Sequence, residues 1–437
     1  MKTPELNSMN FLPEAKDFEQ SSANNLAWLS PLRQNAAKHF LELGIPTIKN
    51  EEWKYTDTRG ILERKFYFPK ESQLQNKELL QRHLNPQDIN IVFVNGHFSS
   101  ELSETKDLPK GISIVNIGNI AAQKDQDLAS LINKYDLRQD DAFCALNNAF
   151  LKDGTFIKVS ENVIEGRLIH IIHLTDTLSK DSVIFPRTLI LAGKSSETKI
   201  IETYASSSEK SYLTGAVSDV FLAANAKLHH YKIQSEGKNA FHIGATRAFQ
   251  ERDSHFESFS LSVGGKLVRN NLSIVLNGEG ADAVLNGLYS VTDHQHIDNH
   301  TSVDHRPPNC TSNQLYKGIL DGHARAVFNG KIFVRREAQK TNSYQLNKNL
   351  LLGAGCQVDT KPQLEIFADD VKCTHGATIG QLDEDELFYL ETRAIPKKLA
   401  TKMLSRGFVN DILDRVESSD VKGRLDSVLT SASTILQ

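Results

Sequence analysis

The sequence predicts a mainly β protein in which a long β-rich body lies between a helical region at the front and another at the end. From about 155 to 380 the chain consists of short runs rich in β-branched and aromatic residues, separated by Gly, Asn and Asp turns. No convincing helix interrupts these runs, whereas helical spacing of apolar residues is clear on either side of them. The predicted order is therefore a helical cap, a β-body and a helical tail.

The length of the β-body favours a β-solenoid, because a closed sandwich or barrel seldom needs so much strand. Asn and Gln recur through AQKTNSYQLNKNLLLG (338–353). In a solenoid, successive rungs stack such side chains in hydrogen-bonding ladders and bury an apolar axis. The amino-acid sequence does not show a single repeat period.

The helical cap begins with SPLRQNAAKHFLELGIP (30–46), in which Ser30 is the expected N-cap and Gly44 the expected end. The apolar positions Leu32, Ala36 and Phe40 repeat every four residues. A short strand and turn are predicted over 89–98. Helical spacing returns in 125–150 through Leu128, Leu131, Ile132 and Tyr135.

The helical tail is predicted from one apolar stripe and one further short segment. The stripe contains Leu399, Met403, Phe408, Ile412 and Val416. RLDSVLTSASTIL (424–436) is expected to form a second short helix, and the acidic run DEDE (383–386) a solvated loop before the tail.

Composition and charge exclude several classes of function. Lys plus Arg number 50 and Asp plus Glu 54, a net charge of −4 without a basic tract, so nucleic acid is not an expected partner. The first residues have no apolar signal region, and no stretch approaches the roughly 18 apolar residues of a membrane span. We therefore expect a cytoplasmic protein without a membrane segment.

Cysteine and glycine patterns exclude two further kinds of site. The four cysteines are widely spaced and form no CxxC pair, which argues against a disulfide framework and a self-contained zinc knuckle. The glycine-rich stretches SVGGKLVRNN (262–271) and LNGEGADAVLNG (276–287) lack the lysine and hydroxyl residue of a phosphate-binding loop. The chain is not expected to hydrolyse ATP by itself.

The stretch DDVKCTHGATIG (369–380) carries a thiol and an imidazole two positions apart. On a strand, Cys373 and His375 share a face with Val371, because successive side chains alternate between faces. Residue statistics favour a buried thiol beside a core histidine. The pair could instead offer N and S ligands to iron, zinc or copper, although two ligands are too few for a structural site. A Cys–His nucleophile is the weaker alternative, since such neighbours stand nearly parallel.

The densest histidine cluster is DHQHIDNHTSVDH (293–305). On a strand, one face would present His294, His296, Asp298 and His300, with His305 after a short turn. Imidazole and carboxylate are usual ligands of divalent ions, so the row is a candidate metal site. Strand spacing separates its members by about 6.6 Å per two residues, so a polar ladder on an outer wall is the competing interpretation. A stand-alone β-helix metalloenzyme using this row is the alternative class of function.

Four long stretches together resemble a known family. They are NEEWKYTDTRGIL (50–62), the segment from HIDNHTSVDH to KNLLLG (296–353), TKPQLEIFADDVKCTHGATIG (360–380) and DELFYLETRAIPKKLATKMLSRGF (385–408). In this order they resemble the SufB/SufD family of the SUF iron–sulfur cluster assembly machinery. The resemblance covers nearly the whole chain from about residue 30, and the Cys-x-His form of 369–380 is that of SufD-like chains.

The resemblance implies a right-handed parallel β-helix flanked by helical domains. The implied domains are an N-terminal mainly helical domain over 1–154, the parallel β-helix over 155–380 and a C-terminal helical domain over 381–437. The implied role is a non-enzymatic scaffold subunit of a SufBCD complex. Such a subunit pairs with a SufB-like partner through the β-helices and recruits a SufC-like ATPase through its C-terminal helices, here Leu399, Met403, Phe408 and Ile412.

The resemblance also gives the Cys-x-His pair a role. It implies that His375, assisted by Cys373, helps to bind a transient iron–sulfur cluster or its iron at the SufB interface, while the isolated chain holds no cofactor stably. The source of iron, binding of flavin to the complex, and a homodimer in the absence of SufB stay open. Two positions depart from the family pattern: Ala394 stands where glycine is usual, and Cys356, expected to be a buried small residue, where a non-thiol is common.

Overall fold

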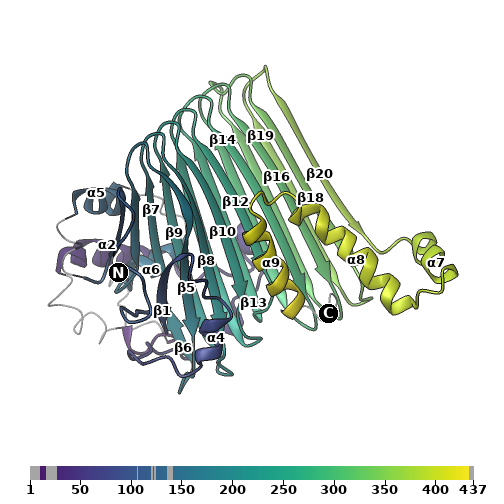
Figure 1. Ribbon diagram of the computed structural model, residues 1–437, viewed down its shortest axis with the longest axis horizontal. Coiled ribbons are helices and arrows are strands. Elements are labelled where there is room, and N and C mark those ends of the chain that lie inside the picture. The colour runs from purple at the N-terminus through teal and green to yellow at the C-terminus, as the bar shows by residue number, and fades with distance from the viewer. Residues whose placement is uncertain are drawn as a thin grey trace.

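The protein is a parallel β-solenoid of about eight turns with helices at both ends (Figure 1). The computed structural model describes residues 10–15, 27–105, 107–119, 122, 125–134 and 141–432. The predicted mainly β class and the order of cap, β-body and tail are confirmed. Strands follow one another from β4 (Thr155–Val159) to β20 (Lys372–Gly380) without an intervening helix in this described stretch.

Two sheets form the solenoid, because successive strands alternate between them. Sheet A contains, in spatial order, β19 (Gln357–Ile366), β17 (Arg325–Val334), β15 (His296–His305), β13 (Leu267–Leu276), β11 (Ala240–Gln250), β9 (Tyr212–Leu222), β7 (Arg187–Ala192), β4 and β3 (Ile112–Asn116), with β6 (Ser182–Ile184) beside β9. Sheet B contains β2 (His97–Phe98), β1 (Ile89–Val94), β5 (Ile164–Thr175), β8 (Glu197–Ser206), β10 (Lys227–Ser235), β12 (His255–Ser262), β14 (Asp282–Val291), β16 (Thr311–Leu320), β18 (Asn342–Leu351) and β20.

The rungs differ in length, which explains why no repeat period is visible in the letters. His255, Asp282, Thr311 and Asn342 occupy one register position in four successive rungs of sheet B. Their unequal spacing in sequence is absorbed by the turns, while the strands stay aligned. The ladder therefore depends on register within strands and not on a fixed number of residues per rung.

Both faces of most strands are buried. Ile200 and Ile201 are neighbours on β8 and both are fully buried, Ile200 in the core between the sheets and Ile201 under the C-terminal helices. On sheet A, Leu213 and Phe241 pack outward against the N-terminal helices. Three apolar layers thus follow one another: helices over sheet A, the axis between the sheets, and helices over sheet B.

Most of the N-terminal region covers the outer face of sheet A, whereas its Leu79 and Leu80 pack on sheet B. Its helical elements are α2 (Ser30–Leu43), α3 (Arg59–Leu62), α4 (Lys77–Gln81), α5 (Gln126–Lys134), α6 (Ala142–Ala149) and the 3-10 turns Ala27–Leu29 and Glu51–Trp53. Helix α2 buries Leu32, Ala36 and Phe40 and ends at Gly44, as predicted. Ser30 is its first helical residue and not the N-cap, because a 3-10 turn leads directly into it. Tyr135 lies outside the described residues.

The C-terminal helices α7 (Glu384–Thr392), α8 (Lys397–Leu413) and α9 (Ser419–Ala432) follow the last strand. The acidic run 383–386 is not the predicted loop: Asp383 accepts hydrogen bonds from the backbone N–H groups of Asp385 and Glu386 and caps α7. Acidic residues favour a helix start because they complement its dipole. Figure 1 shows α8 and α9 against sheet B and α7 projecting beyond it. Among the helices described, none is long and apolar enough to span a membrane.

The two ends of the solenoid differ. At the N-terminal end, β2 pairs with β1 and β3 pairs with β4, both antiparallel to their neighbours. At the C-terminal end, β19 and β20 are the outermost described strands of their sheets. Their residues are mostly half-buried or exposed, whereas the preceding strands are largely buried. The C-terminal end is therefore open.

Candidate ligand pair at the open end of the solenoid

Cys373 and His375 lie on β20, the last strand of sheet B. Their register partners on β18 are Ser343 and Gln345, which are both buried. Ser343 belongs to a hydrogen-bonded row that crosses the interior: its Oγ lies 2.7 Å from Ser312 Oγ, which lies 2.9 Å from His305 Nε2 on sheet A. Cys373 and His375 therefore stand on the inner face of the solenoid, as the strand alternation predicts, at its open end.

The two side chains differ in burial. Cys373 is half-buried and packs with Leu364 and Val371 against Ile332 and Val334. Burial raises the pKa of the Cys373 thiol, so the protonated form is favoured at neutral pH. His375 is exposed, because the described chain adds no rung beyond β20. The statistical expectation of a core histidine is wrong for His375.

Gln345, beside His375 in the ladder, has unsatisfied hydrogen-bonding capacity. Its side chain is fully buried, and neither Oε1 nor Nε2 has a hydrogen-bond partner within the described structure. An unpaired buried amide is costly, and its occurrence calls for a structural reason. The open end thus combines an exposed imidazole, a half-buried thiol and an unsatisfied amide on one inner face.

The predicted histidine row is divided between three places. His296, Asp298 and His300 share the outer face of β15, as expected. His305 is on the same strand but points inward and is fully buried, and burial lowers its pKa to about 4. His294 precedes β15 on a turn, where its ring stacks on His323 at 5.2 Å. The expectation of His305 beyond a turn and of His294 on the strand is therefore wrong.

The outer-face part of the row is occupied by the chain's own segment 51–58. Thr56 Oγ1 donates to Asp298 Oδ2 at 2.5 Å and lies 3.0 Å from His296 Nε2. Arg269 donates to the same Asp298 oxygen at 2.7 Å and to the carbonyl of Glu52 at 2.7 Å. Trp53 lies under the Arg269 guanidinium at 3.9 Å. These contacts anchor the N-terminal region on sheet A.

Ionisation reinforces this anchor. Burial opposes the charged imidazole of His300, but the charge of Asp298 and hydrogen bonds to Asp298 and Glu52 raise its pKa. Burial likewise opposes the Asp298 carboxylate, but the charges of Arg269 and His300 lower the pKa of Asp298. Throughout the described ranges, no group of three or more His, Cys, Asp or Glu side chains is arranged to hold a metal ion. The row acts as a polar contact between chain segments.

The apolar stripe that was predicted to dock an ATPase is exposed at the start of α8 and buried toward its end. Leu399 and Met403 are 48% and 46% exposed. Phe408 is half-buried, and its ring lies 4.0 Å from Lys317 Nζ. Ile412 is buried against sheet B, together with Val416, which follows the end of α8. Ala394, between α7 and α8, has φ of 62°, a left-handed conformation that favours glycine.

Sequence reasoning missed two groups of residues. Phe388 and Tyr389 on α7 are 66% and 57% exposed, and like Leu399 and Met403 they belong to the tail. Their apolar character was visible in the sequence. The second group is a buried ionisable network between the sheets. Its members are Glu202, His230, Lys232, Glu236 and His242. No motif marks it, because inward and outward positions of these strands are both buried.

Two histidine–carboxylate contacts hold the interior network. His230 Nε2 lies 2.8 Å from Glu202 Oε1, and His242 Nδ1 lies 2.6 Å from Glu236 Oε2. Although burial opposes the carboxylate, hydrogen bonds from His230 and Ser218 lower the pKa of Glu202 to about 2. Burial lowers the pKa of Lys232 to about 8. The middle rungs of the solenoid therefore bury ionisable side chains between the two sheets.

The fold and the site define a class: a β-solenoid protein with helices over both sheets and a Cys-x-His pair at an open end. Two family models match the chain. One, described as the SufBD core domain of the SUF system for FeS cluster assembly, matches residues 173–408, and one described as the SufBD protein N-terminal region matches residues 11–171.

Three relatives extend this likeness over most of the chain. A SufBD family protein of Synechocystis for iron–sulfur cluster assembly is 32% identical over 406 residues, which are 90% of this chain and 88% of the relative. The iron–sulfur cluster assembly protein SufD of Escherichia coli is 32% identical over 398 residues, 90% of each chain. The chloroplastic protein ABCI7 of Arabidopsis thaliana is 30% identical over 93% of this chain and 86% of its own length.

The chain belongs to the SufBD family of iron–sulfur cluster assembly proteins. This membership gives it a role in iron–sulfur cluster assembly within the SUF system.

Proposed function

We propose that the protein is a non-enzymatic scaffold subunit that pairs with a SufB-like subunit through the open end of its solenoid. The observation that carries the proposal is the position of Cys373 and His375 on the inner face of a terminal strand, with an exposed imidazole. The outer edge of such a strand offers unpaired backbone N–H and C=O groups to another strand. A partner joined there would complete what is a half-site in this chain.

The nascent iron–sulfur cluster is the cargo of this half-site. The imidazole of His375 is the principal ligand that we assign to this chain, since neutral imidazole and thiolate are suitable ligands for iron. Cys373 assists, because its buried thiol must lose a proton before it can bind metal and its raised pKa opposes this step. The remaining ligands come from the SufB-like partner. We propose no stably bound cofactor for the isolated chain.

We also propose that a SufC-like ATPase docks on the C-terminal helices. Leu399, Met403, Phe388 and Tyr389 expose large apolar side chains on α7 and the start of α8. The rest of α8 is held on sheet B, where Lys317 Nζ donates to the carbonyl of Phe408 at 2.6 Å and pairs with Asp411 at 2.7 Å. A rigid helix with an exposed apolar end is suited to a partner surface. Four free cysteines favour the cytoplasm as the compartment.

The test uses the chain co-produced with the SufB-like and SufC-like subunits of its own source. In complexes with a normal subunit ratio, His375→Ala should lower cluster content and transfer to an apo-acceptor by about tenfold or more. Cys373→Ser should lower them less, since Ser nearly preserves the volume and the imidazole remains. Normal cluster assembly by His375→Ala complexes would contradict the proposal.

His294→Ala is the matched control. His294 is also exposed, but it lies on the turn before β15 and belongs to the histidine row of the alternative metalloenzyme hypothesis. The scaffold proposal expects normal cluster content for His294→Ala and little metal in the isolated parent chain. Stoichiometric metal in the isolated chain, lost on His294→Ala and kept on His375→Ala, would favour the alternative.

A further inference from the structure

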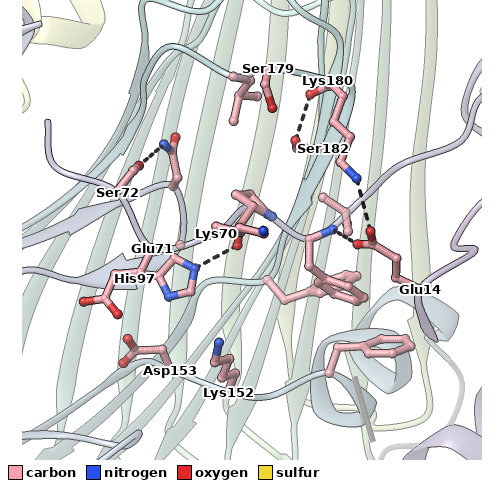
Figure 2. Close-up of a pocket in the computed structure, with 18 of the residues that line it drawn as sticks. Glu14, Lys70, Glu71, Ser72, His97, Lys152, Asp153, Ser179, Lys180 and Ser182 are labelled. Carbon is pink, nitrogen blue, oxygen red and sulfur yellow. Dashed lines mark hydrogen bonds and ion pairs between the residues drawn. The ribbon is translucent and has the colours of Figure 1, made fainter. Parts of the chain in front are cut away.

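A cavity of about 710 Å³ lies at the N-terminal end of the solenoid, far from β20 in the order of strands in sheet B (Figure 2). Five parts of the chain line it: Glu14, residues 68–72, residues 95–97, residues 150–153 and residues 177–185. None of these segments belongs to the Cys-x-His pair or to the tail helices. A cavity of this size is within the usual range for a small-molecule site.

Three phenylalanine rings cluster at an apolar floor of the cavity, Phe68 half-buried and the other two buried beneath it. The centroid of Phe68 lies 5.2 Å from that of Phe150 and 6.3 Å from that of Phe185, and the Phe150 and Phe185 rings stack at 5.6 Å. Leu178 and Val183 extend the apolar lining. Such rings favour a flat apolar or aromatic group, which stacks at similar separations.

Hydrogen bonds hold Asn95 and Ser72, which also line the cavity. Asn95 donates through Nδ2 to Ser72 Oγ at 3.1 Å and accepts at Oδ1 from the backbone N–H of Asp176 at 2.9 Å. Asp176 in turn accepts from the backbone N–H groups of Gln75 and Asn76 at 2.6 Å and 3.0 Å. This part of the cavity wall is therefore held by the chain's own hydrogen bonds.

Two of the carboxylates that line the cavity are already engaged. Glu14 accepts from Lys180 Nζ at 3.1 Å. Asp153 accepts from the backbone N–H groups of Phe98 and Gly154, both at 2.8 Å, and from Asn116 Nδ2 at 2.6 Å. The carboxylate of Glu71 points outward at the left of Figure 2. Lys180 is accordingly neutralised, whereas Lys70 and Lys152 are not.

Lys70 and Lys152 direct their ammonium groups into the cavity from two different segments (Figure 2). Within the part of the chain that the structure describes, neither ammonium group forms an ion pair with a carboxylate, although both share a cavity with three carboxylates. Two positive charges beside an apolar floor are complementary to one anionic group on an apolar ring.

We propose that this cavity binds a small organic anion with a flat apolar ring. The ring lies against the half-buried Phe68, which the buried Phe150 and Phe185 support from behind, and the anionic group lies between Lys70 and Lys152. The chemical class is an aryl carboxylate, sulfonate or phosphate monoester. The proposal is independent of the assembly function, since it uses no residue of the open end.

Isothermal titration calorimetry of the full chain with 1-naphthyl phosphate tests the proposal. We expect one saturable site, weakened about tenfold or more in Lys70→Gln/Lys152→Gln, because two charge-assisted contacts are lost. Lys194→Gln, at an exposed lysine outside the cavity, is the matched control and should bind as the parent does. Equal affinity of the double variant and the parent, or no saturable binding by the parent, would overturn the proposal.

Two further measurements distinguish the contribution of the ligand's ring to binding from that of its charge. Ser179 is exposed on the cavity wall, so Ser179→Trp should fill the cavity and abolish binding without disturbing the core. Neutral 1-naphthol and inorganic phosphate should each bind much more weakly than 1-naphthyl phosphate. Inorganic phosphate binding as tightly as the aryl phosphate, or Ser179→Trp binding it normally, would refute the assigned place of the ring.

Discussion

Arg424 on α9 donates a hydrogen bond to Asp88 Oδ1 at 3.0 Å, although 336 residues separate the two in the chain. Asp88 directly precedes β1, is almost fully buried, and lies 3.7 Å from His170 Nδ1 on β5. Asp420 also pairs with Arg424, at 2.6 Å. The last helix is thus tied to the first strand of sheet B, and the tail is part of the folded body.

Arg424→Gln should destabilise this contact. The change leaves the Asp88 carboxylate buried without its cation. Because Arg424 itself is partly exposed, we expect a moderate loss of stability, on the order of 2 kcal/mol. We expect a lower midpoint of urea unfolding and faster proteolysis within α9. Lys422→Gln is the control, since Lys422 on the same helix forms an exposed pair with Asp414 and should matter little. Equal effects of the two changes would contradict a special role for Arg424.

The division of the apolar stripe on α8 gives a prediction about ATPase docking. Leu399→Ser/Met403→Ser should weaken binding of the SufC-like ATPase about tenfold or more, because exposed apolar anchors dominate such interfaces. The fold should be unaffected, since both side chains are exposed. Surface plasmon resonance measures the first effect and thermal unfolding the second.

Ile412→Ser is the contrasting variant. Ile412 is fully buried against sheet B, so its replacement should lower stability by about 2 kcal/mol or more and should affect docking only through unfolding. Truncation after Leu390 would remove both surfaces together and expose sheet B. Normal ATPase binding by the Leu399→Ser/Met403→Ser chain would show that the docking surface lies elsewhere.

The burial of His173 leads us to expect that the protein loses stability in acid. Its ring lies between Phe93 and Tyr204 at 4.9 Å and 4.8 Å, and neither ring nitrogen has a hydrogen-bond partner among the described residues. Burial lowers its pKa from 6.5 to about 4. Between these values the unfolded chain binds a proton that the folded chain does not, so stability falls as the pH decreases from 6.5 to 4. The loss from this one group is on the order of 3 kcal/mol.

His173→Phe should flatten that part of the pH profile. Phe keeps the aromatic stack and cannot be protonated, so the variant should be more stable than the parent at pH 5 and should change less between pH 6.5 and 4. Guanidinium unfolding at a series of pH values measures both quantities. His294→Phe, at an exposed turn, is the control. A His173→Phe profile as steep as that of the parent would contradict the assignment.

Two glycines on sheet B should respond differently to alanine. A Cβ at Gly318 on β16 would overlap the ring of Tyr289 from the preceding rung, whereas a Cβ at Gly380 on β20 would have no neighbour within 4 Å among the described residues. Gly318→Ala should therefore cost about 1 to 3 kcal/mol of stability through overpacking, and Gly380→Ala little. Similar unfolding midpoints for the two variants would mean that the ring of Tyr289 can move to make room for the added methyl group.

The class of fold could be predicted from the sequence because two patterns were strong: the helical spacing of apolar residues and the short β-rich runs. Helix α2 was recognisable from Leu32, Ala36 and Phe40, and the β-body from turn residues between short runs. The direction of each strand face was harder to predict. Ile200 and Ile201 are both buried, so alternation in a doubly covered sheet does not distinguish inside from outside.

The candidate site was predicted only in part, for a related reason. Strand geometry placed Cys373 and His375 on one face, but the exposure of His375 depends on the absence of a further rung, which no local pattern encodes. His296 and Asp298 contact Thr56, which is more than 200 residues earlier in the chain, so their role as an anchor could not be predicted locally. The anion cavity joins five distant parts of the chain. Contacts of such long range cannot be read from spacing.

Under the proposed pairing, the difference between the two ends of the solenoid limits how subunits can add to one another. At one end the outermost strands β2 and β3 are antiparallel to their neighbours, while at the other β19 and β20 continue the parallel ladder to its edge. When two subunits meet through their open ends, each uses the parallel edge of the other, and the outward ends present a reversed strand in its place. A solenoid whose parallel ladder ran to both ends would present the same edge twice and could add subunits into a fibre. The reversed strands thus favour a pair over a fibre.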